Sequence, residues 1–264
     1  MTEKPIKKTA LFISPHLDDA VFSCGGTMAK MADEGWQTIL CTVFTKSVFS
    51  PKDFALACQL DKNLASDVDY MKLRRAEDSC AARILNVSET LHLNFSEAPH
   101  RGYNSSPELF AGIKPGDRIC RNIAEHLALL GEIYEPEIVF APQGLGNHCD
   151  HLQVIEAVIE FYKEEKVYWY YDTPYAIRQP EAQKYPRLPL VLKQQSQNIS
   201  AYLNAKIEAC AAYKSQINFQ FGSRVNLKKM LTNFHLQSKK DLRVGKFVEH
   251  FLVENIKSTR DFAP

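Results

Sequence analysis

The stretch SPHLDDAVFSCGGT, residues 14–27, places one histidine and two adjacent aspartates directly after a short apolar run. Polar and charged groups are costly to hold at the end of a buried strand unless they are paired or bind a metal. The apolar run predicts a strand over residues 8–13, and the spacing after it predicts a helix over residues 19–34. The histidine and the aspartates therefore stand where a strand passes into a helix.

Apolar and amphipathic segments alternate along the following part of the chain. Strands are expected over residues 37–44, 90–95, 137–141 and 167–172, and helices over residues 54–60, 70–85, 117–134 and 151–164. This alternation is typical of right-handed strand–helix–strand crossovers. It predicts an α/β fold with a Rossmann-like, mostly parallel sheet flanked by helices.

The pattern changes after residue 173. A proline-rich, irregular stretch is followed by helices expected over residues 199–217 and 226–237 and by a last segment over 247–253. We expect one domain over residues 1–264, with a core over 8–175. Residues 176–264 would form a helical C-terminal elaboration that shapes a pocket.

Composition excludes several classes of function. The net charge is +1, so no basic field is directed at nucleic acid or at anionic lipid. No apolar run approaches the roughly 20 residues that span a membrane, and the first apolar stretch ends too early for a secretory signal. The seven cysteines are scattered and odd in number, which argues against a disulfide framework. We expect a cytoplasmic protein with a small-molecule partner; a homo-oligomer is an open possibility.

A second loop repeats the chemistry of the first. His148 and His151 follow the strand expected over residues 137–141, with the same spacing as His16 and Asp19. Either motif alone is also what a helix cap or a polar surface gives. In a parallel sheet, however, both loops lie at the carboxyl ends of strands, where ligands bind. Two histidines and a carboxylate are a recurring catalytic zinc arrangement, so the pair of motifs favours a metal site.

Three motifs resemble one known family, the PIG-L/LmbE-like zinc-dependent N-acetylglucosamine de-N-acetylases. They are PHLDDAVFSCGGT at 15–27, RRAEDSCAARILNV at 74–87 and NHCDH at 147–151. The first is similar to the family's His-Pro-Asp-Asp-Glu followed by Gly-Gly-Thr. The second resembles its Arg-x-x-Glu helix, and the third its His-Pro-Asp-His. The resemblance spans residues 8 to about 175.

The resemblance implies a role for each matching residue. The metal ligands would be His16, Asp19 and His151. Asp18 would be the general base that takes a proton from the attacking water, and His148 would donate a proton to the leaving amine or stabilise the oxyanion. Asp150 would complete the catalytic group by orienting a histidine. Zinc suits the ligand set, and Fe²⁺ or Co²⁺ could also occupy it.

Three positions depart from the family's two histidine-bearing motifs, and in the helix motif Asn86 replaces a glycine, which a helix cap tolerates. Leu17 and Cys149 replace prolines between the ligands, which affects loop stiffness more than ligand identity. Ala20 replaces a glutamate after the paired aspartates, which bears on the substrate class more than on catalysis. Cys149 is expected to pack as a small hydrophobe rather than to bind metal.

Four further residues are candidates for substrate binding. Arg74 is either a surface charge or a substrate anchor that reaches the site. His100, Arg101 and Tyr103 lie on the long irregular segment 96–115, which is either a solvated loop or a substrate lid; long loops beside a strand end favour the lid.

The resemblance implies a zinc-dependent hydrolase that removes an N-acetyl or other acyl group from an amino sugar or a sugar-like conjugate. One alternative is an amidase of the same family that cleaves a larger thiol–sugar or other amide conjugate. A second is a non-catalytic Rossmann-like binding module. Phosphoester hydrolysis would require more clustered carboxylates than the motifs offer. Gly25 and Gly26 lack a dinucleotide fingerprint and are expected to let the first helix pack closely on the sheet.

Overall fold

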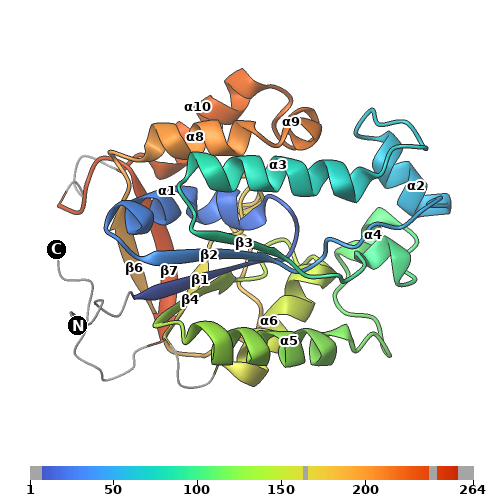
Figure 1. The fold of residues 1–264 in the computed structure, drawn as a ribbon, viewed down its shortest axis with the longest axis horizontal. Coiled ribbons are helices and arrows are strands. Elements are labelled where there is room, and N and C mark those ends of the chain that lie inside the picture. The colour runs from blue at the N-terminus through green and yellow to red at the C-terminus, as the bar shows by residue number, and fades with distance from the viewer. Residues whose placement is uncertain (1–7, 163–165, 238–242, 255–264) are drawn as a thin grey trace, which may run out of the picture.

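The computed structural model describes residues 8–162, 166–237 and 243–254. Residues 1–7 lie outside these ranges. So do residues 163 and 164, the last two of the helix expected over 151–164. The described strands form one seven-stranded sheet in the order β3-β2-β1-β4-β5-β7-β6 (Figure 1). Five of them are parallel, namely β1 (Thr9–Ser14), β2 (Gln37–Thr42), β3 (Glu89–His92), β4 (Ile138–Pro142) and β5 (Lys166–Tyr170). The α/β fold expected from the sequence is confirmed.

Helices cover both faces of the sheet, which explains why β1 is apolar without alternation. Phe12 packs into the core beneath α1 (Asp19–Asp33) and α3 (Tyr70–Ile84), whereas Ile13 packs into the core beneath α5 (Ile119–Tyr134) and α6 (Cys149–Phe161). Figure 1 shows α3 and α5 on opposite sides of the sheet. Every residue of β1 is buried, so its carboxyl end delivers the first loop into the interior.

The C-terminal part differs from its expected helical form. Two strands, β6 (Leu192–Asn198) and β7 (Val248–Glu254), extend the sheet in antiparallel pairing. The strand β6 lies at the edge of the sheet and is polar, so it lacks the apolar pattern by which strands are recognised in a sequence. The helix expected over 199–217 is broken into α8 (Leu203–Ala211) and α9 (Lys214–Phe221). Beyond them lies α10 (Arg224–His235).

The break before α9 has a tertiary cause. Tyr213 leaves helical geometry, and its buried side chain donates a hydrogen bond of 2.5 Å to Asp78 on α3. Its ring also packs edge-on against Phe22 of α1 at 5.5 Å. Helical spacing continues through this point in the sequence, so periodicity alone does not reveal the break.

Helix α1 is clamped by the C-terminal part of the chain. Its glycines do permit a close approach, but to this part rather than to the sheet: a Cβ on Gly26 would lie 2.8 Å from the Ile199 side chain. The buried Lys206 ammonium of α8 lies 2.5 Å from Glu249 of β7, and Glu249 also accepts the backbone N–H of Thr27 at 2.7 Å. The helix that starts at Asp19 is thus held both by α8 and by strand β7 of the sheet.

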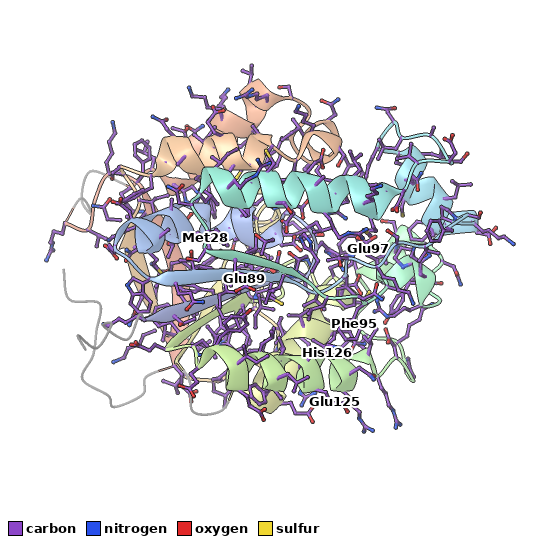
Figure 2. The ribbon with its side chains drawn as sticks, viewed as in Figure 1. Met28, Glu89, Phe95, Glu97, Glu125 and His126 are labelled. Carbon is purple, nitrogen blue, oxygen red and sulfur yellow. The ribbon has the colours of Figure 1, made fainter. Side chains whose placement is uncertain are left out.

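Short elements gather at the carboxyl end of the parallel strands. They are α2 (Asp53–Leu60), η1 (Ala98–His100), α4 (Ser106–Leu109) and α7 (Tyr175–Arg178). Figure 2 shows Phe95 beside His126 of α5, with ring centroids 5.0 Å apart, so the segment after β3 is anchored on that helix. Within the described ranges, none of the helices has the length and apolar character that crossing a membrane requires.

Candidate active site

A cavity of about 270 Å³ opens at this end of the sheet. Its floor is formed by polar side chains from the loops after β1 and β4 and from the start of α3. These floor residues are His16, Asp18, Asp19, Arg74, His148 and Asp150. The structure therefore brings together the two histidine-bearing motifs, as the strand-end argument predicted.

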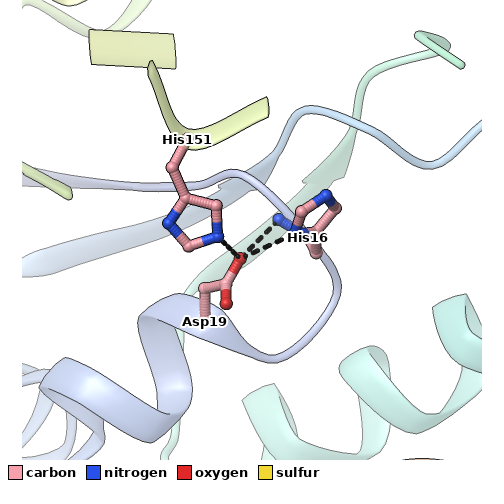
Figure 3. Close-up of side chains that lie close together, drawn as sticks. All are labelled: His16, Asp19 and His151. Atoms are coloured by element: carbon pink, nitrogen blue, oxygen red, sulfur yellow. Dashed lines mark hydrogen bonds and ion pairs between the residues drawn. The ribbon is translucent and has the colours of Figure 1, made fainter. Parts of the chain in front are cut away.

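Three donor atoms converge beside the floor of the cavity. The Asp19 Oδ2 atom lies 3.2 Å from His16 Nδ1 and 3.2 Å from His151 Nε2 (Figure 3). All three atoms lie within 4.8 Å of one another. The Nε2 atom of His151 is buried, and its contact with Asp19 at 3.2 Å does not have hydrogen-bond geometry. Two imidazoles and a carboxylate with an unsatisfied buried nitrogen fit a divalent metal ion.

The position of each candidate ligand follows from local structure. His16 ends the turn that leaves β1, and its backbone N–H donates to Asp19 Oδ2 at 2.9 Å. In the loop before α6, Gly146 has φ 85°, and a Cβ there would lie 2.7 Å from the Tyr175 ring. Only glycine fits that position, so the loop turns closely under Tyr175 and directs His151 toward Asp19.

Asp150 orients His16 from the opposite side. Its Oδ2 atom lies 2.9 Å from His16 Nε2 and accepts the Ala98 N–H at 3.0 Å, and its Oδ1 atom lies 2.8 Å from Arg101. Burial raises the pKa of Asp150, but the hydrogen bond from His16 and the charge of Arg101 outweigh burial and hold it well below its usual range. The carboxylate therefore stays ionised, and the Nδ1 atom of His16 faces Asp19.

Asp172 plays the matching part for His151 and was missed by the sequence reasoning. It follows β5, and its Oδ1 atom lies 2.7 Å from His151 Nδ1, with both side chains fully buried. Its Oδ2 atom accepts the backbone N–H groups of Gln143 at 2.9 Å and Leu145 at 3.2 Å. A carboxylate that holds the far nitrogen of a ligating histidine is typical of metal sites. The strand-end argument, applied to the strand expected over 167–172, would have found it.

Asp18 lies in the cavity floor beside the donor atoms. Its Oδ2 atom lies 3.3 Å from Arg74, which also pairs with Glu97 at 2.8 Å and donates to the Leu17 carbonyl at 3.1 Å. Arg74 is 5% exposed, so it belongs to the site and is not a surface charge. Burial raises the pKa of Asp18 to about 7, against the opposing charge of Arg74.

His148 lies on the other side of the donor atoms. Its ring meets the His16 ring edge-on at 5.0 Å, and its Nδ1 atom accepts the Asp150 N–H at 3.2 Å. Burial, together with the nearby histidines, lowers the pKa of His148 to about 3. The imidazole is therefore neutral near pH 7, and because Nδ1 accepts a hydrogen bond its proton sits on Nε2.

The long loop borders the cavity, but not through the residues singled out in the sequence. Among the residues that the structure describes, His100, Arg101 and Tyr103 do not line the cavity. The same loop lines it through Glu97, Pro99, Leu109 and Phe110. Arg101 and the buried Tyr103 both contact Asp117 at 3.0 Å, so they stand behind Asp150 rather than in front of it. Cys149 packs with Ala98, Tyr103 and Leu109, away from the donor atoms.

Known proteins share both the sequence and the fold. A curated relative, 2'-N-acetylparomamine deacetylase of Streptomyces fradiae, is 32% identical over 158 residues, which make up 60% of this chain and 53% of the relative. The chain thus spans about half the length of this relative. A deacetylase of the teicoplanin biosynthesis pathway superposes with a TM-score of 0.80 at 25% identity, covering 96% of this chain and 100% of the other. The zinc-inhibited form of teicoplanin deacetylase gives a TM-score of 0.78 at 24% identity over the same shares, which shows a common fold.

A family model identifies the chain more directly. The model described as PIG-L: GlcNAc-PI de-N-acetylase matches residues 11–162, which is more than half of the chain. The matched range contains the paired aspartates, Arg74 and both histidines of the second loop, so the family resemblance drawn from the motifs is confirmed. The chain belongs to the PIG-L family.

Proposed function

We propose that the protein is a metal-dependent hydrolase that removes an N-acetyl or other small N-acyl group from an amino sugar or a glycoconjugate. The observation that carries the proposal is the convergence of His16, Asp19 and His151 at one end of a cavity whose floor also holds Asp18 and His148. Membership of the PIG-L family supports the reaction class. Zinc is the metal that the donor set favours, and Fe²⁺ or Co²⁺ would fit the same residues.

Amide hydrolysis needs a polarised carbonyl, a deprotonated water and a protonated leaving amine. A divalent metal held by His16, Asp19 and His151 would supply Lewis acidity at the carbonyl and acidify water. Asp18 would accept the proton of the attacking water. Its pKa of about 7 suits a group that must take up and then release a proton near neutral pH.

His148 and Arg74 would act at the other charges of the reaction. Neutral His148 offers an Nε2–H donor, which favours stabilisation of the developing oxyanion over proton donation to the amine. Arg74 would hold the Asp18 carboxylate in place, since it lies 3.3 Å from Asp18 and is fixed by Glu97. Arg101 and Tyr103 would position Asp150, and through it His16, rather than touch the substrate.

The sugar-containing substrate is proposed from the relatives and from the size of the cavity. One relative is named 2'-N-acetylparomamine deacetylase, and another is named as a deacetylase in the biosynthesis pathway of teicoplanin. A volume of about 270 Å³ encloses one small ring with its acyl group, so a larger conjugate would extend over the rim. Gln216, Phe219 and Gln220 line the cavity, which supports the proposal that residues 176–264 shape the pocket of a single domain.

Metal analysis coupled to an activity screen tests the proposal. Purified protein would be analysed for metal, stripped with a chelator, reloaded with Zn²⁺, Fe²⁺ or Co²⁺, and assayed for acetate and free amine on N-acetylglucosamine and on 2'-N-acetylparomamine. We expect chelator-sensitive release of acetate. His151→Ala should lose the metal, whereas His126→Ala, at the ring contact with Phe95, should retain both metal and activity.

The outcomes separate the alternatives. A bound metal without turnover of small N-acetyl sugars would direct the screen to larger amide conjugates. A chain that binds no divalent metal and releases no acetate would contradict the proposal and favour the non-catalytic binding module.

A further inference from the structure

The outer part of the cavity differs in character from its floor. Aromatic side chains from three separate segments form the rim: Phe54 of α2, Phe110 after α4, and Phe219 of α9. Phe219 is 52% exposed and Phe110 is 38% exposed. Among these apolar rings stands one lysine, Lys62, which follows α2 and lines the same cavity. Its surroundings indicate a binding role that the reaction itself does not require.

Lys62 is a cation seated on aromatic faces. Its Nζ atom lies 4.5 Å from the ring centroid of Phe219 and 5.7 Å from that of Tyr70. It donates one hydrogen bond of 2.6 Å, to the Cys58 carbonyl. An ammonium carries three N–H donors, so two are left for another partner. The two rings fix the position of the charge without neutralising it.

No carboxylate among the described residues forms an ion pair with Lys62. Arg74, a second cation that lines the cavity, is neutralised by Asp18 at 3.3 Å and Glu97 at 2.8 Å. Asp61, the neighbour of Lys62 in sequence, is exposed and does not pair with it. Burial lowers the pKa of Lys62, which reflects the cost of holding this charge partly out of water. An anion placed at Lys62 would offset that cost.

We propose that Lys62 binds an anionic group, a carboxylate or a phosphate, that the substrate carries beyond its amino sugar. Lys62 and the metal-binding floor line one continuous cavity, so a single substrate can reach both. The rings of Phe54 and Phe219 would pack against the part of the substrate between the sugar and the anion. The inference rests on the proposed deacetylase function and names a substrate class for it: N-acyl amino sugars with an acidic substituent.

The competing explanation is a structural one. Lysines near a helix end often donate to the last carbonyls, and the bond from Lys62 to Cys58 is of this kind. A purely structural Lys62 would affect stability and would not distinguish acidic from neutral substrates. The two explanations therefore differ in a measurable way.

Steady-state kinetics with matched substrates tests the proposal. N-acetylglucosamine would be compared with N-acetylglucosamine 6-phosphate and with N-acetylmuramic acid, which carries a carboxylate. A charge-assisted hydrogen bond at a partly exposed site corresponds to about a 10-fold effect, so Lys62→Met should raise KM about 10-fold for an acidic substrate. It should leave kcat, and all values for the neutral sugar, within about twofold of wild type. Lys62→Arg should restore most of the effect, and Lys72→Met, an exposed lysine of α3, is the matched control.

The acidic substrates also distinguish the two anions, because a response with only one of them assigns the site to phosphate or to carboxylate. Equal effects of Lys62→Met on neutral and acidic sugars would overturn the proposal. If no N-acetyl sugar is hydrolysed and no divalent metal is bound, the proposed function fails separately. Calorimetric titration with glucosamine 6-phosphate and glucosamine then tests Lys62 alone: tighter binding of the phosphate that Lys62→Met abolishes supports the anion site, and binding that Lys62→Met does not change refutes it.

Discussion

The substitution Asp172→Asn tests the carboxylate that orients His151 and leaves the proposed metal ligands themselves unchanged. The substitution keeps the size and shape of the side chain but replaces one oxygen by an NH₂ group. In the wild type, Oδ1 faces His151 Nδ1 at 2.7 Å, and Oδ2 accepts two backbone N–H groups, from Gln143 and Leu145. An asparagine cannot accept on both sides.

Either orientation of the amide carries a cost. If its oxygen faces His151, its NH₂ group opposes the two backbone donors, and each buried group left unsatisfied costs about 1–3 kcal/mol. If its oxygen faces the loop, its NH₂ group faces His151 Nδ1 and forces the proton onto Nε2, the atom that faces Asp19. Loss of such an orienting partner lowers metal affinity by about 10–100-fold, which corresponds to about 1.4–2.7 kcal/mol.

The assay is metal affinity, measured by competition with a chromogenic chelator, together with thermal unfolding of the metal-free and metal-loaded protein. Asp78→Asn is the matched control. Asp78 is likewise buried and hydrogen-bonded to a histidine, His92, at 2.9 Å, but neither residue belongs to the candidate metal groups. We expect both variants to be less stable without metal, and only Asp172→Asn to bind metal more weakly. Metal affinity of Asp172→Asn within about twofold of wild type would refute the orienting role, because outer partners of metal ligands normally change affinity by more than that.

Three further predictions follow from other parts of the molecule. Asp18→Asn should keep its bound metal and lower kcat by about 10²–10⁴, as expected for a general base, which metal analysis and initial rates on one sample would check. Lys206→Met leaves the Glu249 carboxylate buried without its ammonium and should destabilise the protein by about 3–5 kcal/mol in urea unfolding; a loss below about 1 kcal/mol would assign the pair no structural role. Burial holds the pKa of His235 well below its usual value. The unfolded chain therefore binds this proton first, and the free energy of unfolding should fall as pH drops below about 6.5, by about 1.4 kcal/mol per pH unit for this group. His235→Gln should show a shallower decline between pH 7 and pH 5 than wild type.

The arrangement of the floor was accessible from the sequence because it depends on chain order and strand direction. His16 and His148 each follow a buried strand, and parallel strands present their carboxyl ends at one edge. Local spacing then brings His16 near Asp19 and His148 near His151. These relations require no knowledge of how the rest of the chain packs.

The residues at the rim of the cavity and the partners of the floor residues could not be predicted in this way. Phe219 reaches the rim because Tyr213 is drawn out of helical geometry to meet Asp78, a residue far away in sequence. Arg101 lies on the predicted loop, yet it does not line the cavity: it pairs with the buried carboxylate of Asp150, a floor residue. The cation–π contact of Lys62 with Phe219 is not visible in the sequence, because it depends on where α9 packs. Tertiary partners, not local periodicity, decided each of these positions.

The two histidines proposed as metal ligands are each held by a carboxylate from a different part of the chain. Asp150 comes from α6 and fixes His16, whereas Asp172 follows β5 and fixes His151. Asp172 lies beyond the range that the family model matches, residues 11–162. A fragment restricted to the matched range would contain every proposed ligand but would lack the group that sets the tautomer of His151. Because the tautomer decides whether Nε2 offers a lone pair, the proposed metal site would require the strand β5 and the residues after it as well as the motifs.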